Sequence, residues 1–120
     1  MQRLLLRSKL HRVRVTEANL NYTGSLTIDE DIMKKAGIAQ WEKLLIANID
    51  NGARFETYAI TGPAGSRTIC LNGAAARLGA VGDMLIVMVF GIYESDETAI
   101  PRILIFDDDN NLVETIEGEQ

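Results

Sequence analysis

Short runs in which apolar residues alternate with polar ones, or follow one another directly, cover most of the chain. Runs of this length and spacing predict β-strands rather than long helices. Nearly every residue of the run 84–93 is apolar, which is typical of a strand covered on both faces. The predicted strands are residues 2–6, 9–16, 43–49, 54–60, 69–71, 84–93 and 102–106.

Residues 29–37 have the features of one short helix. Thr27 and Glu30 can form a capping box, and acidic residues in the first turn suit the positive end of the helix dipole. Gly37 can end this helix, because glycine accepts the left-handed conformation found at helix C-termini. A second short helical or turn segment is expected at residues 73–78.

The pair Asn51-Gly52 lies between two predicted strands. These residue types accept the positive φ angles of a type I′ turn, so segments 43–49 and 54–60 are predicted to form a β-hairpin. Many short strands with one or two short helices in 120 residues indicate a mainly β protein. A small closed or nearly closed barrel is the expected architecture.

No linker, repeat or low-complexity tract interrupts residues 1–106. We therefore predict one domain over residues 1–120, with an acidic tail over residues 107–120 that frays. The acidic run 107–109 in this tail lacks the bidentate glutamate that ends a calcium-binding loop. We expect a solvated turn there and no metal site.

Cys70 is the single cysteine, so the chain cannot form an internal disulfide, and a structural zinc site is not expected. A reducing cytoplasm is therefore the expected location. The longest apolar run, residues 84–90, is much shorter than the about 20 residues that a membrane helix needs. No apolar signal peptide opens the chain, so we expect neither a membrane-spanning nor a secreted protein.

The chain has 12 basic and 17 acidic residues, a net charge of −5, and its overall charge disfavours polyanionic partners. The basic residues are unevenly placed, because residues 1–14 carry five of them and no acid. This basic segment leaves a nucleic-acid binder as one interpretation. A small anionic ligand fits the composition better, and we expect no nucleic-acid partner.

Several polar residues lie within otherwise apolar predicted strands, where a polar group is costly unless it is paired or used. Arg54 and Tyr58 are four residues apart and so share one face of a strand, while Thr57 points to the other face. Arg54 could hold a carboxylate and Tyr58 could supply a phenolic proton, although the two could equally form an ordinary surface pair. The full set is Lys9, His11, Tyr22, Arg54, Thr57, Tyr58 and Asn72.

Two small-residue segments have both a structural and a chemical interpretation. Gly24-Ser25 can be a simple turn before the helix, or a strained turn whose Ser25 Oγ attacks the preceding carbonyl carbon. In the segment 72–76, small side chains leave backbone N–H groups accessible to a carboxylate, although they also suit close packing. The residues alone leave both alternatives open.

Six motifs that occur in order resemble the pyruvoyl-dependent aspartate 1-decarboxylase family over about residues 1–106. They are residues 8–13, 22–25, 51–60, 65–67, 72–76 and 82–83. The resemblance implies a small six-stranded double-psi β-barrel with one or two short helices. It also implies a homotetramer that converts L-aspartate to β-alanine and CO2 for pantothenate biosynthesis.

The resemblance further implies that the proenzyme cuts itself between Gly24 and Ser25. Attack of Ser25 Oγ on the Gly24 carbonyl gives an ester, β-elimination gives dehydroalanine, and loss of ammonia leaves a pyruvoyl group. Residues 1–24 then form a β chain and residues 25–120 an α chain, with no metal and no PLP. A maturation factor for this cleavage is left open.

The family scheme assigns roles to individual residues of this chain. The substrate amine would form a Schiff base with the ketone made from Ser25, and Tyr58 would protonate the carbanion left after CO2 departs. Gly24, Ser25 and Thr57 form the cleavage site, and His11 and Tyr22 have supporting roles. The residues assigned to substrate binding are Lys9, Arg54, Thr57, Asn72, Gly73, Ala74 and Ala75.

Two other functions stay open at this point. A binding module without chemistry would keep the Gly24-Ser25 peptide intact and use Arg54 to hold an anionic ligand. A nucleic-acid binder would use the basic N-terminal strand, and its affinity would fall steeply with salt.

Overall fold

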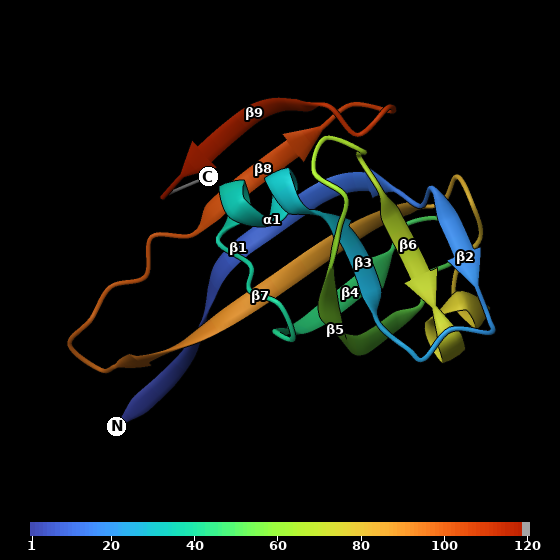
Figure 1. The fold of residues 1–120 in the computed structure, drawn as a ribbon. Helices are drawn as coiled ribbons and strands as arrows, with labels where there is room; N and C mark the ends of the chain where they lie inside the picture. The colour runs from blue at the N-terminus through green and yellow to red at the C-terminus, as the bar shows by residue number, and fades with distance from the viewer. Residues whose placement is uncertain (119–120) are drawn as a thin grey trace.

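The computed structural model describes residues 1–118, which are built mainly from β-strands (Figure 1). The expectation of a mainly β protein is confirmed. Within residues 1–118 there are nine strands, whereas seven were predicted as separate segments, with one α-helix and one 3-10 helix. The elements are β1 (Gln2–Arg14), β2 (Glu17–Asn19), β3 (Leu26–Asp29), α1 (Glu30–Ala36), β4 (Lys43–Asn48), β5 (Arg54–Gly62), β6 (Ile69–Asn72), the 3-10 helix η1 (Gly73–Arg77), β7 (Met84–Glu94), β8 (Arg102–Phe106) and β9 (Leu112–Glu117).

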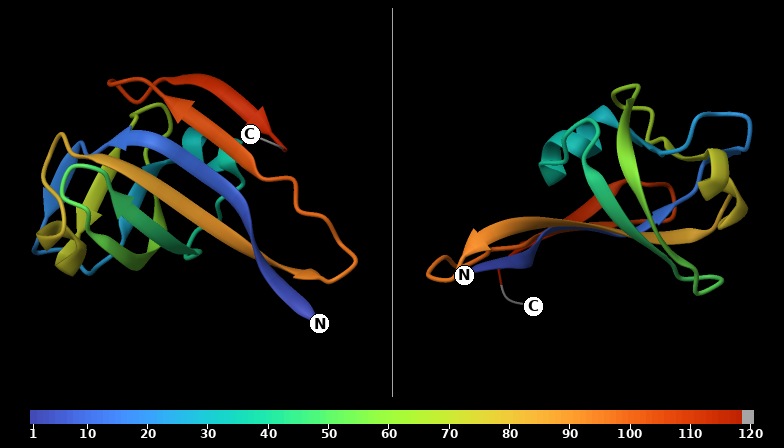
Figure 2. Two further views of the ribbon diagram at one scale, coloured as in Figure 1. Left: turned by 180° about the vertical axis from the view of Figure 1, so that it is seen from behind. Right: turned by 90° about the horizontal axis from the view of Figure 1, so that it is seen from below.

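The strands pair in the order β2-β6-β3-β5-β4-β7-β1-β8-β9. The β1·β8, β2·β6 and β3·β5 pairs are parallel, and the other pairs are antiparallel. The first part of β1 and the last part of β7 project together as a two-stranded arm (Figure 2). Leu4 and Ile92 face each other on this arm, and both are largely exposed.

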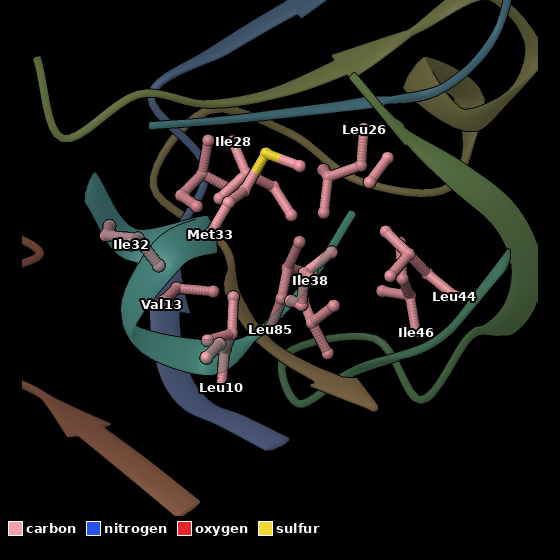
Figure 3. Packing of buried hydrophobic residues seen from close by; sticks show 14 of the residues in the cluster. Leu10, Val13, Leu26, Ile28, Ile32, Met33, Ile38, Leu44, Ile46 and Leu85 are labelled. Carbon is pink, nitrogen blue, oxygen red and sulfur yellow. The ribbon is translucent and has the colours of Figure 1, made fainter. Parts of the chain in front are cut away.

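The hydrophobic core lies between the curved sheet and α1 (Figure 3). Alternate residues of the strands point into it, as the period of two along a strand requires. Helix α1 covers the core with its apolar face, which comprises Ile32, Met33 and Ala36. The strand residues at its centre include Leu10, Val13, Leu26, Ile28, Leu44, Ile46, Ala59, Ile69, Leu71, Leu85 and Val87.

The N-terminal apolar segments form one long strand, not the two that were predicted. β1 runs without a break from Gln2 to Arg14, with register shifts against β7 between Leu6 and Ser8 and between His11 and Val13. Arg12, inside the second shift, has a φ of 71°. Such bulges insert a residue, so the alternation along the strand changes without ending it.

The helix was predicted correctly, but not its N-cap. Asp29, not Thr27, accepts the N–H of Asp31 at 2.8 Å. The same carboxylate accepts the backbone N–H groups of Gly65 at 3.0 Å and Arg67 at 2.7 Å, so it also orders the loop before β6. At the other end, Gly37 adopts the expected left-handed conformation.

The predicted β4–β5 hairpin is present, but its turn is not of type I′. Gly52 has a φ of 76°, whereas Asn51 does not have the positive φ that a type I′ turn requires. The loop is longer, because the N–H of Asn48 already bonds the carbonyl of Ala53 at 2.8 Å. The prediction of two covered faces for β7 is also wrong, since only the face of Leu85, Val87 and Val89 is fully buried.

The expectation that the chain frays from residue 107 is wrong for residues 107–118. The Asp107 carboxylate accepts two backbone N–H groups of the turn, from Asp109 and Asn111, each at 2.9 Å. β9 then pairs antiparallel with β8, from Arg102 opposite Glu117 onward. Residues 119 and 120 of the expected tail lie outside the described residues.

Candidate functional site

The Gly24-Ser25 peptide lies immediately before β3 in a strained conformation. Gly24 has a φ of 48° and Ser25 a φ of 103°. The Ser25 angle is unfavourable for a residue with a Cβ, and strain of this kind persists only where surrounding contacts impose it. Ser25 is completely buried, with 0% of its surface exposed. A serine hydroxyl is therefore held on a strained backbone and away from bulk water.

Asn72, at the end of β6, makes the contacts that hold Ser25. Its side-chain Nδ2 donates to Ser25 Oγ at 3.0 Å and to Thr27 Oγ1 at 2.8 Å. Its backbone N–H donates to the Ser25 carbonyl oxygen at 3.0 Å. The antiparallel pairing of β3 with β6 brings these residues together, with Leu26 opposite Leu71. Asn72 thus fixes Ser25 at both its side chain and its backbone.

Gly73 packs its backbone against the chain just before Ser25. A Cβ atom at position 73 would lie 2.5 Å from the Gly24 nitrogen and 2.7 Å from the Tyr22 carbonyl oxygen. Gly73 also has a φ of 62°, which favours glycine. Both constraints show why position 73 has no side chain.

Tyr58 approaches the same peptide from β5. Its hydroxyl donates to the Thr23 carbonyl oxygen at 3.3 Å, and it lies 3.7 Å from the place where a Cβ of Gly24 would be. Ser25, Asn72, Gly73 and Tyr58 therefore meet around Gly24, although they come from three separate regions of the sequence. The structure thus brings together one nucleophile, one amide donor and one phenol.

The side chains of Thr57 and Tyr22 do not share the contacts that join Ser25, Asn72, Gly73 and Tyr58 around Gly24. Thr57 pairs with Leu44 across the hairpin, and within residues 1–118 no hydrogen bond joins its side chain to Gly24 or Ser25. The Tyr22 side chain is exposed, while its carbonyl oxygen accepts the Gly24 N–H at 3.0 Å. Ala75 is buried beside Gly73, and Ala74 is exposed.

The expected cationic residues lie on the outer face of the sheet. Successive strand pairs place His11 opposite Ile86, Ile86 opposite Ala47, and Ala47 opposite Arg54, so these four form one row across β1, β7, β4 and β5. Lys9 lies two residues along β1 on the same face. No contact in the described part of one chain joins Lys9 or His11 to Ser25.

His11 is half-buried and lies near two cationic side chains. Desolvation by burial, followed by the positive charges of Lys9 and Arg12, lowers the pKa of His11 below its usual value. Its Nδ1 is buried and has no hydrogen-bond partner in the described chain.

The sequence prediction missed three residues beside the site. Thr27 accepts from Asn72, and the Cys70 thiol donates to Asn72 Oδ1 at 3.1 Å. Burial, and then the nearby Glu17 carboxylate, raise the pKa of this thiol, which favours its protonated, donating form. The indole ring of Trp41 lies against the Tyr58 ring. Cys70 and Thr27 could have been found from the sequence, because each lies two residues from a residue of the site along the chain, Asn72 and Ser25 respectively.

The described residues were also compared with the requirements of a metal site and of a membrane-spanning helix. Among residues 1–118, no group of three or more His, Cys, Asp or Glu side chains is arranged to hold a metal ion. None of the helices in the same part of the chain has the length and apolar character required to cross a membrane.

The arrangement defines a class of protein in which a strained, buried glycine–serine peptide stands beside hydrogen-bond donors on a β-sheet. The sequence model of the family described as aspartate decarboxylase matches residues 1–113, so this chain belongs to the aspartate decarboxylase family, a family of enzymes.

Relatives at high identity cover almost the whole chain. The chain is 57% identical to a protein named aspartate 1-decarboxylase from Syntrophobacter fumaroxidans, over 92% of this chain and 90% of the relative. It is 53% identical to a protein of the same name from Caldicellulosiruptor saccharolyticus, over 97% and 92% of the two chains. A Bacillus cereus protein, also named aspartate 1-decarboxylase, is 50% identical over 100% of this chain and 96% of its own.

Proposed function

We propose that this protein decarboxylates L-aspartate to β-alanine and CO2, using a pyruvoyl group that it makes from its own Ser25. The observation that carries this proposal is the strained, fully buried Ser25, whose Oγ accepts a hydrogen bond from Asn72 next to the Gly24 peptide. Membership of the aspartate decarboxylase family supports the substrate. β-Alanine made in this way would supply pantothenate biosynthesis.

Self-cleavage starts at the peptide bond between Gly24 and Ser25. Ser25 Oγ attacks the Gly24 carbonyl carbon, the C–N bond breaks, and the hydroxyl proton passes to the released amine, giving an ester. Loss of the Ser25 α proton then breaks the Cβ–Oγ bond, and Gly24 leaves as the carboxylate of a β chain, residues 1–24. The α chain, residues 25–120, then begins with dehydroalanine. Hydrolysis by one water releases the nitrogen of this residue as ammonia and leaves the ketone.

The contacts around Ser25 suit both stages of this cleavage. Asn72 Nδ2 donates to Oγ at 3.0 Å, so it can stabilise the negative charge that develops on this oxygen when the Cβ–Oγ bond breaks. The buried position of Ser25 in the uncut chain limits hydrolysis of the ester before elimination, and the one water that the last step consumes has to reach the site afterwards. Thr57, adjacent to Tyr58 on β5, is proposed to position the carbonyl under attack.

The residues present fit a pyruvoyl group at position 25. It would serve as the electron sink for the pair released with CO2. The Tyr58 hydroxyl, beside Gly24, is proposed to protonate the resulting carbanion. Arg54, on the same face of β5 as Tyr58, and Lys9 are proposed to hold substrate carboxylate. Asn72 and the backbone of Gly73, Ala74 and Ala75 would line the substrate, while His11 and Tyr22 have supporting roles.

We further propose that the core of the fold is a six-stranded double-psi barrel. β1 and β2 are separated by only two residues, yet β1 pairs with β7 and β2 pairs with β6. Between them, Thr16 N–H and Ile69 carbonyl are joined at 2.8 Å. The segment 2–19 therefore contacts both ends of the series β6-β3-β5-β4-β7, which supports closure with six strands.

A homotetramer is the proposed assembly. Leu4 and Ile92 of the arm are exposed, and they line a pocket of about 500 Å³ together with Leu45 and Phe90. Burial of such apolar surface between copies would stabilise the assembly. The proposed location is the cytoplasm, because a chain with one cysteine needs no oxidising compartment. A maturation factor that assists cleavage is compatible with this scheme.

The test measures β-alanine and CO2 formed from aspartate by the purified protein. A parallel sample is treated with sodium borohydride beforehand, which reduces a ketone and leaves ordinary side chains intact. We expect stoichiometric formation of both products by the untreated protein and none by the treated one. A protein that binds aspartate but forms no β-alanine would instead be a binding module, and an activity that survives borohydride would exclude the pyruvoyl group.

A further inference from the structure

Trp41 is the only tryptophan of the chain, and its position beside Tyr58 is unusual. Its side chain is 68% exposed, although a large aromatic ring normally gains stability by burial. The centroids of the Trp41 and Tyr58 rings are 5.8 Å apart, and the ring planes are tilted by 35°. This separation and tilt lie in the range of favourable aromatic pairs. The contact thus links an exposed indole to the residue proposed as the proton donor.

The backbone fixes Trp41 in this place. Its φ of 73° is in the left-handed region, which a residue with a Cβ rarely adopts. Its N–H donates to the Ala59 carbonyl at 2.8 Å, and the Ala59 N–H donates to the Glu42 carbonyl at 2.9 Å. The turn that carries Trp41 is therefore joined to β5 immediately after Tyr58.

Further contacts hold the same turn from both sides. Gln40 Oε1 accepts both the N–H and the hydroxyl of Thr61 at 2.7 Å. Glu42 forms an ion pair with Arg7 of β1, and its other carboxylate oxygen accepts the Ala39 N–H at 3.0 Å. Trp41 is thus an exposed side chain on a strongly anchored backbone.

The Tyr58 hydroxyl has one hydrogen bond in the described chain, to the Thr23 carbonyl, and its length of 3.3 Å is beyond the usual range. This bond alone is a weak constraint on the phenol. The indole ring is a second neighbour of the Tyr58 side chain, because the two rings are in contact.

We propose that Trp41 is a positioning residue that holds the Tyr58 hydroxyl beside Gly24, at the Thr23 carbonyl. This inference rests on the proposed function, in which Tyr58 donates a proton to the carbanion. Trp41 acts through Tyr58 and does not itself contact the reacting atoms. Its loss should therefore reduce kcat and leave KM for aspartate nearly unchanged.

The experiment compares Trp41→Ala, Trp41→Phe and the parent protein, with kcat expressed per ketone-bearing chain counted by mass spectrometry. Trp41→Ala should lower kcat about 10- to 100-fold, as expected when a catalytic group is misplaced. Trp41→Phe keeps an aromatic ring and should restore most of kcat. Ile100→Ala is the matched control, because Ile100 is also 68% exposed and is not part of the site.

A fluorescence measurement tests the ring contact without reference to activity. Tyr58→Ala should shift the emission of the sole tryptophan to longer wavelength, because the indole loses its neighbour, whereas Tyr93→Ala should not. An active parent whose Trp41→Ala variant keeps full kcat, or whose Trp41→Phe variant is as slow as Trp41→Ala, would overturn the positioning role. A parent with no β-alanine formation would overturn the proposed function itself, whatever the fluorescence shows.

Discussion

Asn72 holds Ser25 at two points, by donating its side-chain Nδ2 to Ser25 Oγ and its backbone N–H to the Ser25 carbonyl oxygen, each at 3.0 Å. Ser25, held by these two bonds, has the strained φ of 103°, although it carries a Cβ. Strain of this kind, concentrated next to a peptide bond, is typical of a functional site. The geometry therefore links the fold of β3 and β6 directly to the proposed cleavage.

Gly73→Ala is expected to block cleavage at Gly24. The new Cβ would lie 2.5 Å from the Gly24 nitrogen, so the cleaved peptide would have to move. Gly52→Ala is the matched control, because Gly52 also has positive φ, but a Cβ added there would meet nothing within 4 Å. The control should lose only about 1–3 kcal/mol from backbone strain and still be cut. Cleavage is measured by gel electrophoresis of the denatured proteins. If Gly73→Ala is cut as completely as Gly52→Ala, close packing at position 73 is not needed for cleavage.

Tyr58→Phe is expected to lower kcat by about 10²- to 10⁴-fold, the usual contribution of a positioned proton donor. The ring and its contact with Trp41 are kept, and only the hydroxyl is removed. Turnover is measured on fully cut protein, with Tyr93→Phe as the control. Turnover within a factor of about two of the parent would show that another group donates the proton.

Arg54→Ala is expected to weaken recognition of aspartate. Loss of a charge-assisted pair to one carboxylate should reduce kcat/KM by the equivalent of about 1.5–3 kcal/mol. Arg54→Lys should restore this only in part, because lysine lacks the planar two-pronged donor. Arg3→Ala, at the exposed start of β1, is the control. If kcat/KM is the same in all variants, Arg54 is an ordinary surface residue.

Stability should depend on pH through Asp83. Hydrogen bonds from the Asn48 side chain and then from the Ala80 N–H lower the pKa of this carboxyl below its usual value. The ionised form therefore stabilises the folded state above the unfolded pKa of about 3.9, and this contribution is lost as the pH falls through the lower folded value. Asp83→Asn should be less stable than the parent at pH 7, with the difference shrinking below about pH 4 in urea unfolding. A difference independent of pH would refute the assignment.

Local features of the fold could be predicted from the sequence. Gly37 ends α1 as expected, and the β4–β5 hairpin was predicted from the pair Asn51-Gly52 between two strands, although the turn type was not. The N-cap was mispredicted because Asp29 also takes N–H groups from Gly65 and Arg67, which are distant in sequence. Long-range contacts of this kind leave no local pattern.

The residues of the candidate site could also be predicted from the sequence only in part. The Gly24-Ser25 pair and Asn72 could be singled out by residue type and by family motif. The contact of Trp41 with Tyr58 could not, because it depends on how the turn before β4 joins β5. The row that places His11 and Lys9 on the same face as Arg54 likewise follows from the strand order, which the sequence does not reveal.

The intact-mass spectrum of the purified, denatured protein tests self-cleavage at Ser25 most directly. We expect two chains, residues 1–24 and 25–120, with the larger one lighter than a serine-initiated chain by one ammonia. Ser25→Ala should give one uncut chain, because it lacks the Oγ that attacks Gly24. A parent cut to leave an unmodified serine, a fully intact parent that still forms β-alanine, or a Ser25→Ala variant cut like the parent would contradict the account.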